Sequence, residues 1–269
     1  MKNPETLTVE PIGFVHCGKT LKFEAPHQPD SESDETNTIE LLPGKQFEIA
    51  LEDLAGFERI WLVWWFDKNK TWRPRAMPPR GPAKRRGTFA TRSPHRPNPI
   101  GLTCVPLLAV EGLSLTVGPL DLMDGTPILD IKPYITAVDC FPNSAQGWIG
   151  EVEAHIAVSP RYEIIVSKKA ERQLAWLREH WHIDFSPKAF AALEIDPTPH
   201  RTRRILRVGD RIRMACGPWR MFYRIDEFTV TIDEIQKGYS DESLVKPGHE
   251  KIVDRIAQIE FSAQTFGDS

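Results

Sequence analysis

Residues 91–102, TRSPHRPNPIGL, constrain the fold more than any other stretch of this chain. Each of the three prolines fixes φ near about −65° and pushes the preceding residue towards an extended conformation. Neither an ordinary helix nor a central strand tolerates that mixture. We therefore predict a stiff loop that presents Arg92, His95, Arg96 and Asn98 as hydrogen-bond donors. Such a preformed loop can hold an anion or a polar ligand at small entropic cost.

Basic residues gather in two stretches, although the chain carries a net charge of −3. No acidic residue lies between Asp67 and Glu111, where ten Lys and Arg are found, and residues 200–213 hold six Arg. Two basic patches on a mildly acidic chain are typical of a protein that meets a polyanion. A solvated charged face is the alternative for either patch alone. The candidate phosphate contacts are Arg73, Arg75, Arg80, Lys84, Arg85, Arg86, Arg201, Arg203, Arg204 and Arg207.

The first part of the chain reads as short strands separated by Gly and Pro, which indicates an antiparallel barrel or sandwich. The strands are predicted at 7–16, 59–66, 84–92, 101–112, 113–122 and 127–135, with a short helix at 50–57. The strand at 59–66 is apolar throughout and is expected to be buried. No GxGxxG motif or strand–helix repeat supports a Rossmann domain.

After Pro160 the pattern becomes mixed. Helices are predicted at 167–181 and 186–196, the second with Ser186 as its N-cap. A hairpin is predicted at 220–236 and a terminal helix at 249–261, with Ile252, Ile256 and Ile259 on its apolar stripe. The fold class is therefore mainly β, with an N-terminal domain over 1–158 and a smaller α+β domain over 159–269.

The chain shows no signal peptide and no apolar run long enough for a membrane span. Its four cysteines are widely spaced, which is typical of reduced thiols in a cytoplasmic protein.

Asp121, Asp124 and Asp130 surround the Asp-Gly turn of LDLMDGTPILDIKPY, residues 120–134. Carboxylates and turn amides can hold a ribose or an adenosine, but an Asp-Gly turn is also a common plain turn. A metal site is a weak alternative, since nothing else shows metal-ligand spacing. Trp72, among Arg and Pro residues, is a candidate for stacking on a base.

Five motifs in order closely resemble the TsaA/TrmO family, whose members are S-adenosylmethionine-dependent tRNA methyltransferases. The motifs are KFEAPHQP, ALEDLAGFERIWLVWWF, WRPRAMPPRGP, GTFATRSPHRPNPIGL and LDLMDGTPILDIKPY. The resemblance covers about residues 8–158, and DPTPHR (196–201) with the hairpin after it is similar to the family's small C-terminal domain.

The resemblance implies a β-barrel, a homodimer with S-adenosylmethionine near the subunit interface, and methylation of N6 of threonylcarbamoyladenosine beside the anticodon of tRNA. The basic residues named above would then bind the anticodon stem-loop. The cofactor-binding residues that it implies are Pro26, His27, Gln28, Asp67, Lys68, Arg92, Arg96, Asn98, Leu102, Asp121, Leu122, Met123 and Asp124. No general base and no metal ligand can be named.

Two alternatives remain open at this point. The chain could be a tRNA-binding module without catalysis, or a methyltransferase for a small molecule. The binding module would bind tRNA but not the cofactor. For the small-molecule methyltransferase, charge reversal within 200–213 would leave activity intact.

Overall fold

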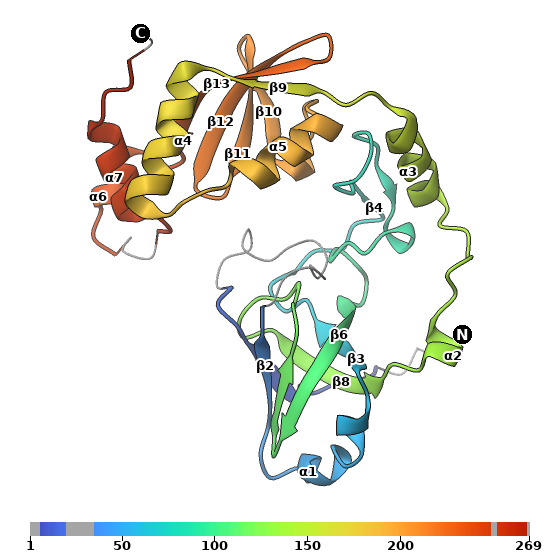
Figure 1. Cartoon of the computed structure of the whole chain (residues 1–269). Coiled ribbons are helices and arrows are strands. Elements are labelled where there is room, and N and C mark those ends of the chain that lie inside the picture. Colours follow the sequence, from blue (N-terminus) through green and yellow to red (C-terminus); the bar gives the residue numbers. More distant parts are fainter. Residues whose placement is uncertain (1–5, 20–34, 249–251, 268–269) are drawn as a thin grey trace. The chain divides into compact units, whose positions relative to one another are not determined.

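The structure, a computed structural model, describes residues 6–19, 35–248 and 252–267. They form two compact units (Figure 1). Unit 1 comprises the residues up to 76 together with 85–144, and unit 2 comprises 77–84 together with the residues from 145 onward. The boundary expected at 158 lies at the end of helix α3 (Trp148–Val158), which belongs to unit 2.

Unit 1 is built on a closed antiparallel barrel with the strand order β1-β2-β7-β6-β3-β8. The strands are β1 (Gly13–His16), β2 (Asn37–Leu41), β3 (Arg59–Trp65), β6 (Ile100–Glu111), β7 (Ser114–Val117) and β8 (Pro127–Pro133). β1 pairs with β2 on one side and with β8 on the other, which closes the sheet. Of the two architectures that the strand pattern allowed, the barrel is confirmed.

Side chains alternate between the barrel interior and its surface, as the pleat of a strand requires. On β3, Ile60, Leu62 and Trp64 are buried, whereas Trp65 is exposed. The expectation of a strand buried throughout is therefore wrong for its outward residues. Gly101 on β6 lies opposite Trp64, and a Cβ at this glycine would overlap the Trp64 indole.

Short helical segments and one small hairpin complete unit 1. They are α1 (Phe47–Ala50), η1 (Leu54–Gly56), β4 (Arg75–Ala76), β5 (Arg86–Gly87), η2 (Thr88–Ala90) and α2 (Thr136–Asp139). The strand expected at 84–92 is confirmed only at Arg86–Gly87, and beyond Gly87 the chain turns. There the Thr88 hydroxyl donates to the Arg73 carbonyl and the Thr91 hydroxyl donates to the Thr88 carbonyl. Such side-chain bonds to the backbone favour a turn over a strand.

Unit 2 is an α+β unit around a five-stranded sheet of order β10-β11-β12-β13-β9. Its remaining elements are β9 (Glu163–Val166), α4 (Lys168–Trp181), α5 (Ser186–Ile195), η3 (Arg201–Arg203), β10 (Ile205–Val208), β11 (Arg211–Cys216), β12 (Trp219–Asp226), β13 (Thr229–Lys237), α6 (Asp241–Val245) and α7 (Arg255–Ala263). Helices α4 and α5 share one core with the sheet (Figure 1).

The helix starts and faces differ in part from expectation. α4 begins as predicted, since the Ser167 hydroxyl accepts from the Ala170 amide at 3.1 Å. The N-cap of α5 is Phe185, one residue earlier than expected, and Ser186 is the first residue of the helix. The Asp184 carboxylate accepts from the Ser186 amide at 3.0 Å. The apolar face predicted for the terminal helix is also wrong. In α7 Phe261 is buried, while Ile256 is 56% exposed. Among the described helices, none is long and apolar enough to cross a bilayer.

Candidate functional site

The Asp-Gly loop at 120–125 is fastened to the end of β1. Asp124 Oδ1 accepts from the Cys17 amide at 3.0 Å, and the Asp124 amide donates to the Lys19 carbonyl at 2.9 Å. The Gly125 amide donates to the Val15 carbonyl at 2.8 Å. Burial raises the pKa of the Cys17 thiol, which disfavours its thiolate form. The loop is thus a held structure and not a free surface turn.

Lys19 connects this loop to a second segment. Its Nζ donates to the Leu120 carbonyl at 2.9 Å and pairs with Glu35 at 2.7 Å. Residues 20–34, which carry the expected cofactor residues Pro26, His27 and Gln28, lie outside the described residues. The described residues on either side of that segment, Lys19 and Glu35, therefore meet beside the Asp-Gly loop.

Asp121 stands at the end of a short chain of buried hydrogen bonds. The Trp64 indole N–H donates to Thr103 Oγ1 at 3.1 Å, and the Thr103 hydroxyl donates to Asp121 Oδ1 at 2.9 Å. Burial raises the pKa of Asp121, while the bond from Thr103 and the charges of Arg92 and Lys19 act to lower it. The site holds a carboxylate acceptor with cationic side chains close enough to act on it.

The loop at 91–99 is stiff, as expected from its prolines. The Phe66 amide donates to the Pro99 carbonyl at 2.8 Å, and Asn69 Nδ2 donates to the Pro94 carbonyl at 2.7 Å. Arg96 Nη1 donates to the Thr91 carbonyl at 2.7 Å, so this guanidinium holds the loop's own backbone. Hydrogen bonds thus join the turn after β3 to the Pro-rich loop.

The expected cofactor residues differ in how exposed they are to solvent. Arg92 is exposed and lies within electrostatic range of Asp121. Leu122 is buried in the barrel core, which leaves only its backbone for a ligand. The other expected residues are half-buried or exposed: Asp67, Lys68, Asn98, Leu102, Met123 and Asp124. Two residues that the sequence did not single out, Thr103 and Lys19, turn out to support the site.

The expected phosphate contacts fall on both units. In unit 1, Arg73, Arg75 and Arg85 are exposed and Arg86 is half-buried. In unit 2, Arg80 pairs with Glu153 at 3.3 Å, and Arg203 pairs with Asp196 at 2.7 Å. The exposed members of unit 2 are Arg80, Lys84, Arg201, Arg204 and Arg207.

The inserted loop 77–84 packs within unit 2 on α3 and η3. The Thr202 hydroxyl donates to the Met77 carbonyl at 3.1 Å. Gly81, with φ +71°, lies so close to Val152 that an added Cβ would meet its side chain. Basic residues of the two stretches, far apart in the sequence, are thereby brought into the same unit.

The DPTPHR motif forms a compact turn between α5 and β10. Asp196 Oδ1 accepts from the Thr198 amide at 3.0 Å, and the buried Tyr223 hydroxyl donates to the Pro197 carbonyl at 2.6 Å. His200 is 2% exposed, and burial lowers its pKa. The motif therefore has a clear structural role, whatever it contributes to binding.

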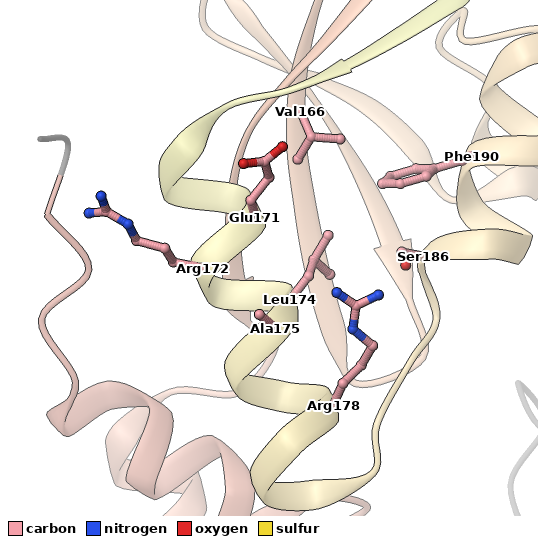
Figure 2. Close-up of a pocket in the computed structure, with 8 residues that line it drawn as sticks. All are labelled: Val166, Glu171, Arg172, Leu174, Ala175, Arg178, Ser186 and Phe190. Atoms are coloured by element: carbon pink, nitrogen blue, oxygen red, sulfur yellow. The ribbon is translucent and has the colours of Figure 1, made fainter.

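A cavity of about 420 Å³ lies between α4 and α5 in unit 2 (Figure 2). Val166, Leu174 and Phe190 give it an apolar lining, and Glu171 and Arg178 lie along its wall. None of the expected site residues that the structure describes lines this cavity.

Comparisons with known proteins agree with the barrel and its motifs. A family model described as the tRNA-methyltransferase O N-terminal domain matches residues 14–140. A probable S-adenosyl-L-methionine-binding protein of Archaeoglobus fulgidus is 42% identical over 140 residues, which is 52% of this chain and 37% of that protein. The chain thus spans little more than a third of the length of this relative.

Two further relatives match over most of their length. The tRNA (adenine(37)-N6)-methyltransferase of Escherichia coli is 32% identical over 179 residues, 64% of this chain and 74% of that protein. The crystal structure of TrmO from Pseudomonas aeruginosa covers 86% of this chain and 98% of its own, with 27% identity and a TM-score of 0.50.

Proposed function

The chain belongs to the TrmO family of tRNA methyltransferases, and from that premise we propose that it methylates N6 of an adenine beside the anticodon of tRNA. S-adenosylmethionine is the methyl donor, and threonylcarbamoyladenosine is the proposed target base. The single observation that carries the proposal is the Asp121 site, where a held loop, a half-buried acceptor and nearby cations meet. A tRNA substrate implies that the protein acts in the cytoplasm.

The donor set of the site fits S-adenosylmethionine. An ionised carboxylate only accepts hydrogen bonds, so Asp121 suits a ribose hydroxyl. The guanidinium of Arg92 suits the carboxylate of the amino acid part. When bound, the cofactor supplies a methyl group that its positively charged sulfur already activates. What this chain has to provide is therefore alignment of donor and acceptor, and exclusion of water.

Alignment is what the hydrogen bonds of the site provide. Trp64 and Thr103 fix the Asp121 carboxylate from inside the barrel. Cys17 and Lys19 fix the Asp-Gly loop from the side, and Arg96 keeps the Pro-rich loop in shape. Met123, Asp124 and Asn98 belong to the same proposed pocket. The family resemblance adds Pro26, His27 and Gln28, which lie outside the described residues. Asp67 and Lys68 would border it through the turn that is bonded to the Pro-rich loop.

The barrel surface supports the homodimer that we propose. Ile100, Leu102 and Leu108 on β6 point outward and are 44%, 53% and 55% exposed. Trp65, paired with Ile100, extends this apolar strip onto β3. Apolar side chains repeated along one outer face are typical of a surface that a partner covers. Leu102 would then contribute to the cofactor site from its place at the interface.

Methyl transfer from labelled S-adenosylmethionine to tRNA of a strain that lacks the modification tests the function. We expect label in tRNA that carries threonylcarbamoyladenosine and none in tRNA without it. We also expect Arg92→Ala to raise the dissociation constant of the cofactor, with Arg161→Ala, an exposed arginine of unit 2, as the matched control. A folded protein that binds the cofactor but leaves tRNA unlabelled would contradict the proposal.

A further inference from the structure

Two large aromatic side chains lie exposed next to each other on the basic segment of unit 1. Trp72 is 50% exposed and Phe89 is 75% exposed. Their ring centroids are 6.2 Å apart, and the ring planes differ by 24°. Single exposed apolar residues are common, but two nearly parallel exposed rings present a flat apolar surface to solvent.

The pair is held in place by the hairpin β4–β5. Arg75 pairs with Gly87, and the Thr88 amide donates to the Pro74 carbonyl at 3.0 Å. This register carries Trp72 and Phe89 to neighbouring positions just beyond the paired residues. The rings are therefore positioned before any ligand binds, which reduces the entropic cost of binding.

The Arg96 guanidinium lies over the Phe89 ring, which is still 75% exposed. The Arg96 guanidinium carbon lies 5.8 Å from the centre of the Phe89 ring, while Nη1 is bonded to the Thr91 carbonyl. Arg96 thus connects the ring pair to the Pro-rich loop, whose Arg92 acts on Asp121. The ring pair is thereby connected to the loop that carries Arg92, one of the proposed cofactor residues.

The positive charge near the rings favours an anionic ligand. Arg73 and Arg75 are exposed beside Trp72, and the sequence has no acidic residue between Asp67 and Glu111. A flat apolar surface surrounded by cations matches a nucleobase on a phosphate backbone. We propose that Trp72 and Phe89 form a platform on which an unpaired base of the anticodon loop stacks. This inference rests on the proposed function and adds a recognition site for the RNA, separate from the site of chemistry.

Binding of an anticodon stem-loop RNA that carries 2-aminopurine at one loop position after another tests the platform with the full chain. Stacking should quench the fluorescence of the probe at one or two positions. We expect Phe89→Ala and Trp72→Ala each to weaken binding by roughly tenfold, the effect of one lost base–aromatic stack, and to abolish that quenching. Trp72→Phe and Phe89→Tyr keep an aromatic ring and should retain both.

The salt dependence separates stacking from charge. Because no charge is removed, the ring variants should keep the wild-type slope of affinity against salt concentration. Arg73→Ala should reduce that slope by about one phosphate contact. Ile49→Ala removes a comparably exposed apolar side chain, outside both the platform and the proposed dimer surface, and should leave binding unchanged.

The outcomes distinguish this inference from the proposed function. If the wild-type chain binds and methylates tRNA and both ring variants do the same with normal quenching, the platform is wrong and the enzyme stands. If the rings govern RNA binding in a chain that transfers no methyl group, the platform stands and the enzyme does not. A wild-type chain that does not bind the stem-loop at all overturns both.

Discussion

Replacing Thr103 by Val tests whether the buried hydrogen bonds position Asp121. The substitution keeps the shape of the side chain but removes the hydroxyl that joins Trp64 to Asp121. The Trp64 indole N–H then lies buried without its acceptor, which costs about 1–3 kcal/mol. Asp121 also loses a donor, and because this carboxylate is only partly buried we add about 1 kcal/mol. The total is a loss of about 2–4 kcal/mol in the stability of unit 1.

Hydrogen exchange of peptides from β3 and β6 reports the stability of unit 1 apart from unit 2. We expect faster exchange in Thr103→Val and no change in Thr116→Val, a half-buried threonine on the neighbouring strand β7. Exchange rates equal to the wild type in both variants would show that the bonds observed here do not hold the barrel end together.

Cofactor binding gives the second readout, with a defined sign. An ionised Asp121 accepts from a ribose hydroxyl more strongly than a protonated one, so affinity should fall as the pH falls through its raised pKa. The Thr103 hydroxyl is the largest of the influences that lower the pKa of Asp121. Without it the pKa rises further, and the loss of affinity should begin at a higher pH.

The stability of the fold depends on pH with the opposite sign. A raised carboxyl pKa stabilises the fold below that pKa, and the contribution is lost as the pH rises through it. Calorimetric titrations over a pH series measure the affinity, and coincident pH profiles of wild type and variant would refute the assignment.

Three further substitutions test other parts of the structure. Gly101→Ala places a Cβ into the Trp64 indole and should destabilise unit 1 by about 2 kcal/mol or more in a thermal melt. Tyr223→Phe removes the bond to the Pro197 carbonyl and should cost unit 2 about 1–2 kcal/mol, seen in the exchange of its sheet amides. Arg201→Ala should weaken tRNA binding and lower its salt slope by about one contact, measured by filter binding.

Each of these has a matched comparison. Gly87→Ala, where a Cβ meets open space, should melt like the wild type. Arg203→Ala should lower the stability of unit 2 more than it changes the salt slope, because Arg203 is already paired with Asp196. Equal salt slopes for Arg201→Ala and wild type would remove Arg201 from the proposed RNA surface.

Much of the fold follows from local patterns in the sequence. The period of Ala170, Leu174 and Leu177 predicts α4 with its Ser167 start, and the prolines of 91–99 predict a stiff loop. The predictions fail where a contact between residues far apart in the sequence determines which side chain is buried. Phe261 of α7 lies inward because it packs against Trp219, 42 residues earlier, and the isoleucines of the helix do not reveal this contact.

The candidate site shows the same division. Asp121 and Arg92 stand out in the sequence as polar residues of long motifs. Thr103 does not, because it is a β-branched residue in a strand, and only the pairing of β3 with β6 brings Trp64 to it. Lys19 joins Leu120 across 101 residues of chain, a contact that no local pattern announces. Supporting residues of a site are set by tertiary pairing, so the sequence identifies the ligand-facing groups more readily than the groups that hold them.

The loop 77–84 has a consequence for how this protein can be divided. It leaves unit 1 after β4 and returns before β5, but its contacts through Met77, Arg80 and Gly81 are with unit 2. The chain therefore passes between the units three times, after residues 76, 84 and 144. No single cut of the chain therefore separates the two units completely. A fragment that starts at residue 145 lacks the loop 77–84, which Thr202 and Val152 contact. Variants of one unit should therefore be made in the full chain, because the backbone of each unit is interrupted by a segment of the other.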